Sequence, residues 1–318
     1  MPMLSILKSA AFLLGYLPAF VYWPLGRLLG SIADRIGGSR RRIAIENLNT
    51  AYKGEPLPAD AEEITRKVFM HLGVMLFEFM RMAWLKKEDL NGYVACEGRE
   101  NLDKALLKGK GVIILTAHLG NWELIAAWCG LSEYPIDIVA RDLDNPALDA
   151  FVRWVRTRSG NRLLSKKGSM RALIKRLNGN GIAGILADQN VTESEGVFVD
   201  FFGRPACTNK GPAILAAATG AAVIPAFMLR EGRGHRLVFH DEIRLVNTGK
   251  REEDARENTA LFTKAIEDMV RERPDEWFWL HRRWKTRPPW EENVPKNNDK
   301  KKKKKKKRRD GNVNYFVS

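Results

Sequence analysis

The segment from Gly111 to Trp128, GVIILTAHLGNWELIAAW, constrains the fold more than any other part of the chain. Its first half is an apolar, β-branched run typical of a buried strand, and its second half has the composition of an apolar helix. Asn121 between them is a residue type preferred at helix N-caps. This strand–turn–helix unit predicts an α/β protein with His118 at the carboxyl end of the strand, where ligands bind in open α/β sheets.

The same alternation continues along the chain. Strands are expected at 93–97, 112–116, 136–140, 182–187, 222–228 and 236–243, and helices at 39–52, 59–85, 102–107, 121–129, 146–158, 169–178, 211–219 and 253–271. The pattern predicts an α/β fold with a mixed, largely parallel sheet flanked by helices. His71 and Glu78, in the long amphipathic helix, are expected on its surface.

His118 and Glu123 are the first candidates for chemistry, since they are five residues apart around the turn. With His118 in the turn and Glu123 in the first helical turn, the two side chains can face each other. A carboxylate would then hold a histidine base in one tautomer. Taken alone, a histidine five residues before a glutamate is more often structural than catalytic, so the pair by itself does not establish a catalytic site.

Two other predicted strands release polar residues at their carboxyl ends. Asp188, with Gln189, follows the strand at 182–187, and Arg141 follows the strand at 136–140. Because parallel strands end at one edge, these groups are expected near His118, which favours a site there. Asp188 could equally be a helix N-cap or a turn residue.

Two aromatic segments leave alternatives open. The stretch 196–205, GVFVDFFGRP, could form an apolar wall with Arg204 as its cationic edge, or a hairpin tip packed on the core. The stretch 277–290, WFWLHRRWKTRPPW, suggests contact with phosphates or a membrane interface. A capping helix with solvated arginines is the alternative.

The N-terminal region predicts a membrane anchor. Residues 9–26 carry no charge. The length of this uncharged segment is at the lower limit for a helix that spans a bilayer. Pro18 and Pro24 argue against one straight helix, so insertion into the interface is an equal alternative. Arg27 and the arginines after it place the rest of the chain in the cytoplasm and argue against a cleaved signal peptide. We expect an anchor over 1–38, a catalytic domain over 39–290 and a disordered polybasic tail over 291–318.

Charge and missing motifs narrow the function. Of the net charge of +15, ten charges lie in the uninterrupted run 300–309, which leaves +5 for the rest. That balance fits contact with anionic lipid or phosphates. The three cysteines (Cys96, Cys129 and Cys207) are widely separated, which fits a reducing compartment. The sequence holds no zinc motif, nucleophile elbow or phosphate-binding loop, which favours direct transfer with His118 activating the acceptor.

Five segments occur together in order: HLGNWE, RDLDNP, ADQN, FFGRP and HRRWKTRP. With them, the chain resembles the late-acting lauroyl/myristoyl acyltransferases of lipid A biosynthesis, from the N-terminal segment to about Pro289. The resemblance implies a glycerolipid-acyltransferase-like fold with an HX4E motif at the bacterial inner membrane. It implies transfer of an acyl chain from acyl carrier protein to a hydroxyl of a lipid A precursor of the Kdo-lipid IVA type. No metal, other cofactor or acyl-enzyme is expected.

The resemblance also implies roles for individual residues. His118 would be the base and Glu123 its orienting partner; Arg141 would stabilise the thioester oxyanion or hold the donor; Asp188 and Arg204 would line the site. The amides of Gly120, Asn121 and Trp122 would be a further candidate oxyanion hole.

Expected partners are acyl carrier protein, the lipid A precursor and inner-membrane phospholipid, with no nucleic acid. The polylysine tail is outside the family pattern and would either bind anionic lipid or be dispensable. The nearest rival is the same chemistry on another glycolipid or phosphoglycolipid. A non-catalytic polybasic binder of membranes or nucleic acid would leave the strand-end residues unexplained.

Overall fold

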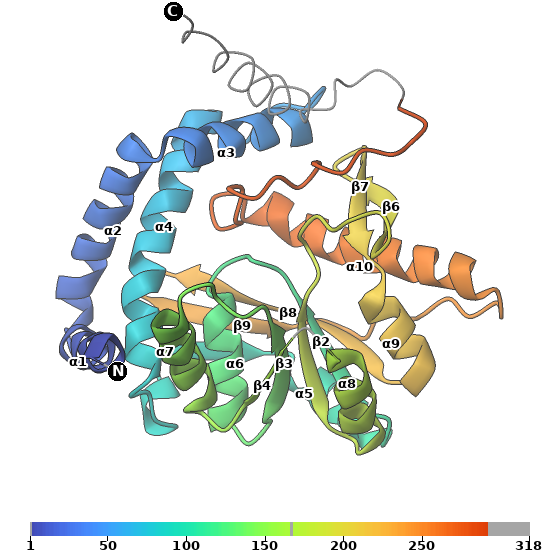
Figure 1. Ribbon diagram of the computed structural model, residues 1–318, viewed down its shortest axis with the longest axis horizontal. Coiled ribbons are helices and arrows are strands. Elements are labelled where there is room, and N and C mark those ends of the chain that lie inside the picture. The colour runs from blue at the N-terminus through green and yellow to red at the C-terminus, as the bar shows by residue number, and fades with distance from the viewer. Residues whose placement is uncertain (1, 166–167, 292–318) are drawn as a thin grey trace, which may run out of the picture. The chain divides into compact units, whose positions relative to one another are not determined.

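The computed structural model describes residues 2–165 and 168–291, and the chain up to Thr286 forms one compact unit (Figure 1). The helices are α1 (Pro2–Gly15), α2 (Ala19–Ile36), α3 (Gly38–Ala51), α4 (Ala61–Met82), the short 3-10 helix η1 (Glu88–Leu90), α5 (Arg99–Leu107), α6 (Trp122–Leu131), α7 (Pro146–Thr157), α8 (Ser169–Asn178), α9 (Gly211–Thr219) and α10 (Arg251–Glu272). The strands are β1 (Val94–Glu97), β2 (Val112–Thr116), β3 (Ile136–Ala140), β4 (Arg162–Ser165), β5 (Ile182–Leu186), β6 (Gly196–Phe201), β7 (Arg204–Asn209), β8 (Ala222–Glu231) and β9 (Gly234–Phe239). Except for Glu291, the predicted tail at 291–318 lies outside the described residues.

Seven of these strands form the central sheet, in the order β1-β9-β8-β2-β5-β3-β4. Only the β8–β9 pair is antiparallel within that sheet; the other neighbours are parallel. The prediction of an α/β fold with a mostly parallel sheet flanked by helices is therefore confirmed. Every residue of the central strand β2 is buried, as expected for a parallel strand covered on both faces.

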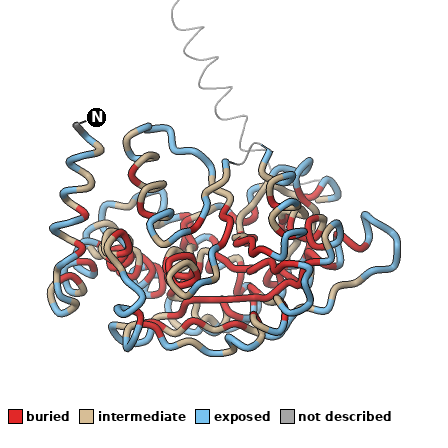
Figure 2. Tube along the Cα trace, turned by 90° about the horizontal axis from the view of Figure 1, so that it is seen from below, coloured by how far each residue is buried: buried red, intermediate tan, exposed pale blue. Residues whose placement is uncertain are grey.

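Helices cover the two faces of the sheet and create two apolar layers. Residues of α5, α6 and α7 pack with alternate strand residues such as Ile114 on one face. Residues of α8, α9 and α10 pack with Ile113 and its equivalents on the other. The continuous buried segments through the middle of the molecule are visible in Figure 2.

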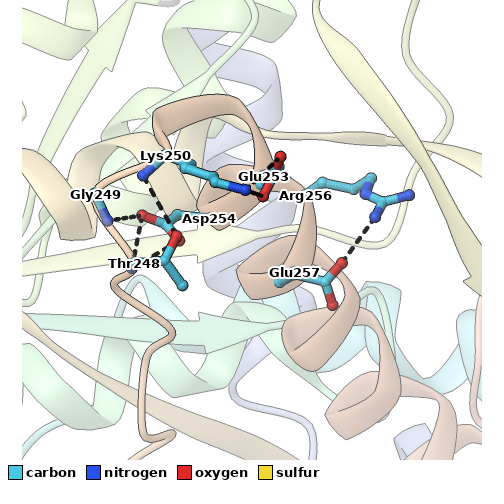
Figure 3. Close-up of polar contacts among 7 residues, drawn as sticks. All are labelled: Thr248, Gly249, Lys250, Glu253, Asp254, Arg256 and Glu257. Atoms are coloured by element: carbon cyan, nitrogen blue, oxygen red, sulfur yellow. Dashed lines mark hydrogen bonds and ion pairs between the residues drawn. The ribbon is translucent and has the colours of Figure 1, made fainter.

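The turn before α10 fixes where that helix begins. The Asp254 carboxylate accepts hydrogen bonds from the backbone amides of Thr248 and Gly249 and from the Thr248 hydroxyl (Figure 3). An exposed ion pair joins Lys250 to Glu253 at the start of α10, and another joins Arg256 to Glu257 within the helix. An acidic residue in the first turn also suits the positive end of the helix dipole.

The N-terminal segment differs from its prediction. It forms two helices, α1 and α2, separated at Pro18, and no helix among the described residues is long and apolar enough to cross a membrane. The predicted spanning anchor is therefore not supported. Instead, α2 packs closely against α4: a Cβ on Gly30 would lie 2.2 Å from the Phe69 carbonyl oxygen, and one on Gly73 would lie 2.1 Å from that of Gly26. These glycines allow the two helix backbones to approach.

Three strands add to the six expected ones: β4, and the β6 and β7 strands of the hairpin that was one of the two alternatives for 196–205. The edge strand β4 lacks an apolar run, and β6 and β7 form a separate hairpin whose tip is Phe202–Gly203. The hairpin reading of 196–205 is therefore confirmed, with Phe201 and Phe202 buried. The segment at 277–286 is irregular rather than a capping helix, and it buries Trp277, Trp279 and Arg283.

Candidate active site

His118 follows β2 and is hydrogen-bonded to Asp188, which follows the neighbouring strand β5. The His118 Nδ1 atom lies 2.8 Å from Asp188 Oδ1, and the His118 backbone amide donates to Asp188 Oδ2 at 3.0 Å. The expectation that parallel strands bring the two residues to one edge is confirmed. The ring keeps Nε2 on its other side, where the Gln189 side-chain amide nitrogen lies 3.4 Å away.

The surroundings shift the pKa of both members of this pair. Burial alone would lower the His118 pKa, but the Asp188 carboxylate more than offsets burial, so the pKa is raised above 6.5. Burial alone would raise the Asp188 pKa, but the imidazole, together with hydrogen bonds from His118 and Trp277, lowers it to about 2. Asp188 is therefore an ionised carboxylate that holds the Nδ1–H tautomer of His118.

Glu123 does not orient His118. Both its oxygens accept hydrogen bonds from Arg156 of α7, at 2.8 and 2.5 Å. The predicted geometry is wrong because Glu123 lies one residue inside α6, on the side that faces α7, while Asp188 already occupies the His118 Nδ1 atom. Arg156 was missed by the sequence reasoning; it is 33 residues from Glu123, and no local pattern connects them.

The C-terminal segment of the unit closes around the pair. The Trp277 indole N–H donates to Asp188 Oδ2 at 2.8 Å, and the Phe278 amide donates to the His118 carbonyl at 2.9 Å. The rings of Trp122 and Phe278 lie 5.1 and 6.2 Å from the imidazole ring. Aromatic residues predicted to contact phosphates or a membrane thus serve to fix the histidine and its carboxylate.

The turn after His118 is held by hydrogen bonds that exclude two predicted oxyanion donors. The Gly120 amide donates to the Glu276 carbonyl at 3.1 Å, and the Asn121 amide donates to the Met228 carbonyl at 2.8 Å. Of the three amides predicted, only that of Trp122 remains a candidate. Gly120 has a φ of +59°, and a Cβ there would lie 1.9 Å from the Met228 carbonyl oxygen, so the turn requires glycine.

Asn121 connects this turn to a buried ionic network. Its side-chain oxygen caps α6 by accepting from the Leu124 amide, and its side-chain nitrogen donates to Glu78 of α4 at 2.9 Å. Glu78 also accepts two hydrogen bonds from Arg230 of β8, at 2.8 and 2.7 Å. His71 contacts the Gly120 carbonyl at 3.0 Å. His71 and Glu78 are both buried, so their predicted place on the helix surface is wrong.

The buried charges of Glu78 and Arg230 stabilise each other as an ion pair. Burial opposes ionisation of Glu78, but Arg230 lowers the Glu78 pKa well below its usual range. Burial and the neighbouring Arg230 lower the His71 pKa to about 4, which keeps that ring neutral at physiological pH. The turn is therefore supported by an ion pair and a neutral histidine, both inside the protein.

A cavity of about 1050 Å³ adjoins His118 and is lined mainly by apolar side chains. Polar residues also line it, among them His118, Glu123, Arg141, Arg156, Gln189, Glu195, Lys210 and Lys285. Arg141 lies at the predicted sheet edge, but its side chain is 82 % exposed and is 3.6 Å from Asp144. Arg204 pairs with Phe201 at the hairpin end and is not among the described residues that line this cavity.

Comparison with known proteins identifies the family. Residues 4–286 match the sequence profile of the bacterial lipid A biosynthesis acyltransferase family. The chain is 29 % identical to the lipid A biosynthesis lauroyltransferase of Escherichia coli K12, covering 88 % of this chain and 89 % of the relative. It is 28 % identical to the palmitoleoyltransferase of that bacterium, over 87 % and 89 %. It is 29 % identical to a phosphatidylinositol mannoside acyltransferase of Mycobacterium tuberculosis, over 59 % and 58 %. The chain belongs to the bacterial lipid A biosynthesis acyltransferase family and is an acyltransferase.

Proposed function

We propose that the protein transfers a fatty acyl chain from acyl carrier protein to a hydroxyl of a lipid A precursor of the Kdo-lipid IVA type. The observation that carries the proposal is the His118–Asp188 pair at the wall of a large apolar cavity. A base beside a cavity suited to an alkyl chain is what a one-step acyl transfer needs. The HX4E turn after a central parallel strand also fits a glycerolipid-acyltransferase-like fold.

His118 alone can accept and return the proton that moves in this step. Asp188 holds the proton on Nδ1, so the Nε2 lone pair can accept from the acceptor hydroxyl when that hydroxyl takes the place of the Gln189 amide nitrogen, which lies 3.4 Å from Nε2. As the hydroxyl oxygen attacks the thioester carbonyl carbon, its proton moves to Nε2. The carbon–sulfur bond then breaks, and the departing sulfur takes that proton. The products are the new ester and the free thiol of the carrier, with no acyl-enzyme.

Arg156 is our candidate for stabilising the negative charge on the thioester oxygen. Its guanidinium lines the cavity and is fixed there by two hydrogen bonds to Glu123. Planar, two-point pairing limits the rotation of the arginine and keeps the donor geometry ready. We therefore assign Glu123 a positioning role through Arg156, and Arg141, which is more exposed, a role in holding the donor or a phosphate.

We place the protein on the bacterial inner membrane, with the catalytic unit facing the cytoplasm. Large apolar side chains are exposed on α1 and α2 and in the turn between them, among them Phe12, Leu13, Tyr16, Phe20, Leu28 and Ile36. Lys8 and Arg27 lie on the same two helices. A pair of helices that exposes apolar side chains together with basic residues can bind at the surface of anionic bilayers.

A second acceptor class has one observation in its favour. The mycobacterial relative is named for a phosphatidylinositol mannoside, which is a phosphoglycolipid without a lipid A core. Its match spans only 59 % of this chain. We therefore keep another glycolipid or phosphoglycolipid as the alternative acceptor.

The test is transfer by the purified full chain from a panel of acyl-carrier-protein thioesters to Kdo-lipid IVA or to a phosphatidylinositol mannoside, with product masses measured. We expect one acyl chain to be added to Kdo-lipid IVA. His118→Ala should reduce the rate by about 10²–10⁴-fold, whereas His240→Ala, a half-buried histidine outside the cavity, should not. Transfer only to the mannoside would establish the alternative. A His118→Ala rate near that of the unmodified protein would refute the base assignment.

A further inference from the structure

The cavity beside His118 reaches both faces of the central sheet. Its lining includes Ile114, Ile136 and Ile138, which belong to the apolar layer under α6 and α7. It also includes Leu173 and Leu215, which belong to the layer under α8, α9 and α10. Neighbouring strand residues point to opposite faces, so a cavity lined by both sets has two parts, here named the α6 lobe and the α9 lobe.

The passage between the lobes lies where β3 and β5 separate. These strands are paired from Ile136↔Ile182 to Ile138↔Gly184 and no further. Beyond that point β3 continues beside β4, and β5 continues beside β2. Val139, Ala140, Ile185 and Leu186, the residues past the last pair, all line the cavity. The sheet is thus open at its carboxyl edge, next to His118.

Gly184 marks the floor of the α6 lobe. It is the last β5 residue paired with β3, and it lines the cavity. A Cβ at this position would lie 3.0 Å from Ile136 Cδ1. Any larger side chain would therefore enter the space between β5 and the isoleucines of β3.

The lobes differ in how open they are. The α6 lobe is walled by Ile114, Ile125 and Ile136, each at most 3 % exposed, so it suits the closed end of a single alkyl chain. The α9 lobe reaches Met170, which is 40 % exposed, and has Lys210, Lys285 and Glu195 on its wall. The Lys210 ammonium also pairs with Glu252 at 3.4 Å, whereas the Glu252 side chain is 81 % exposed to solvent. Ammonium groups beside an open apolar lobe complement a lipid with an anionic head group.

We propose that two alkyl chains meet at His118 from opposite faces of the sheet. The acyl chain of the donor occupies the α6 lobe, and an acyl chain of the anionic acceptor lipid occupies the α9 lobe. This inference rests on the proposed function and adds a separate binding site for the acceptor's own chain. The volume of about 1050 Å³ is at the upper end of the range for a pocket that holds one small ligand.

Two space-filling variants test the assignment. Gly184→Val fills the α6 lobe, and Ile214→Trp, on α9, fills the other. Leu261→Trp, a partly exposed position on α10 outside the cavity, is the matched control. Gly184→Val should lower kcat/KM for long donors relative to short ones by about tenfold, leaving the acceptor KM unchanged. Ile214→Trp should raise the acceptor KM by about tenfold and leave the donor preference unchanged. Both variants acting on the same substrate, or exchanged effects, would overturn the proposal.

A binding measurement separates this proposal from the proposed function. Equilibrium dialysis with radiolabelled dodecyl phosphate should give two bound molecules per chain for the unmodified protein and for Leu261→Trp, and one for each lobe variant. One molecule for the unmodified protein would refute the second lobe. If two molecules bind but no acyl transfer to either lipid occurs, the two lobes stand and the proposed function fails.

Discussion

Replacing Asp188 with asparagine is the sharpest test of the site, because it removes one charge without changing the size of the side chain. Asp188 is 3 % exposed and accepts from the His118 amide, the His118 ring and the Trp277 indole. Its pKa of about 2, against an ordinary 3.8, corresponds to about 2 kcal/mol of stabilisation of the ionised form.

The effect on catalysis should exceed the effect on folding. The single oxygen of the asparagine amide can still accept from the backbone amide of His118 and from Trp277. Its NH2 group then faces His118 Nδ1 and favours the tautomer with the proton on Nε2. That ring cannot take a proton from the acceptor. The equivalent change in Ser-His-Asp triads lowers kcat by about 10⁴-fold, and we expect a loss of about 10³–10⁴-fold here.

The His118–Asp188 interaction makes the stability of the fold depend on pH. Asp188 contributes stability that is present above pH ~3.9 and is lost as pH falls through about 2. His118, with its raised pKa, contributes stability below pH ~6.5 that is lost as pH rises through its folded pKa. The destabilisation caused by Asp188→Asn should therefore be largest between these limits, at about pH 4–6.5.

The assay is kcat/KM for acyl transfer against pH, with urea unfolding at matched pH values. His118 must be neutral to act, so the acid limb for the unmodified protein should lie above pH 6.5. Removal of the carboxylate should move any residual limb to lower pH. An Asp188→Asn variant that keeps its kcat and its acid limb would refute the role of the pair.

Three further predictions concern the support of the site and its membrane face. Glu78→Gln should lower the free energy of unfolding by about 3–5 kcal/mol in urea titrations, because Arg230 is left buried without its counter-charge. The control is Glu97→Gln, which breaks the exposed pair Arg236–Glu97 and should lower the free energy of unfolding by less than about 1 kcal/mol. Equal losses for both would contradict the buried network. Burial raises the pKa of Glu276 to about 7, so the free energy of unfolding should fall by about 3 kcal/mol as pH rises from about 4.5 to 7. Glu276→Gln should make the free energy of unfolding less dependent on pH in this range. The same pH dependence in both proteins would contradict the prediction. The double variant Leu13→Glu/Phe20→Glu, at residues 68 % and 65 % exposed, should sediment less with anionic vesicles and keep its unfolding midpoint. The control Leu107→Glu on α5, at a residue 86 % exposed, should bind vesicles like the unmodified protein. Unchanged vesicle binding by the double variant would refute the proposed membrane contact of α1 and α2.

The local part of the fold could be predicted because its signal is local. The run Val112–Thr116 and the cap Asn121 lie within ten residues of His118, and both form the expected strand and helix start. The common sheet edge of His118 and Asp188 followed from the general geometry of parallel strands. Their direct hydrogen bond could not be predicted, because it requires β5 to lie beside β2, and the sequence of neither strand predicts which strand is its neighbour.

The missed residues all act across long stretches of sequence. Arg156 reaches Glu123 from α7, and Glu78 reaches Asn121 from α4. Each pairing depends on how two helices pack, so neither residue is distinguishable in the sequence from an ordinary surface ion. The sequence of 196–205 leaves the β6–β7 hairpin as one of two alternatives. Its turn, Phe202–Gly203, has a positive φ at the phenylalanine, a conformation that this residue type rarely adopts and that the sequence does not predict.

The contacts of Trp277 and Phe278 with Asp188 and His118 have a consequence for biosynthesis. A nascent chain can form β2, β5 and their helices on the ribosome, yet the indole and amide that fix the histidine emerge among the last residues of the compact unit. The hydrogen bonds around His118 and Asp188 can therefore be completed only near the end of translation. A chain that ends before Trp277 lacks both of these hydrogen-bond donors, so we expect it to transfer acyl chains more slowly than the full chain.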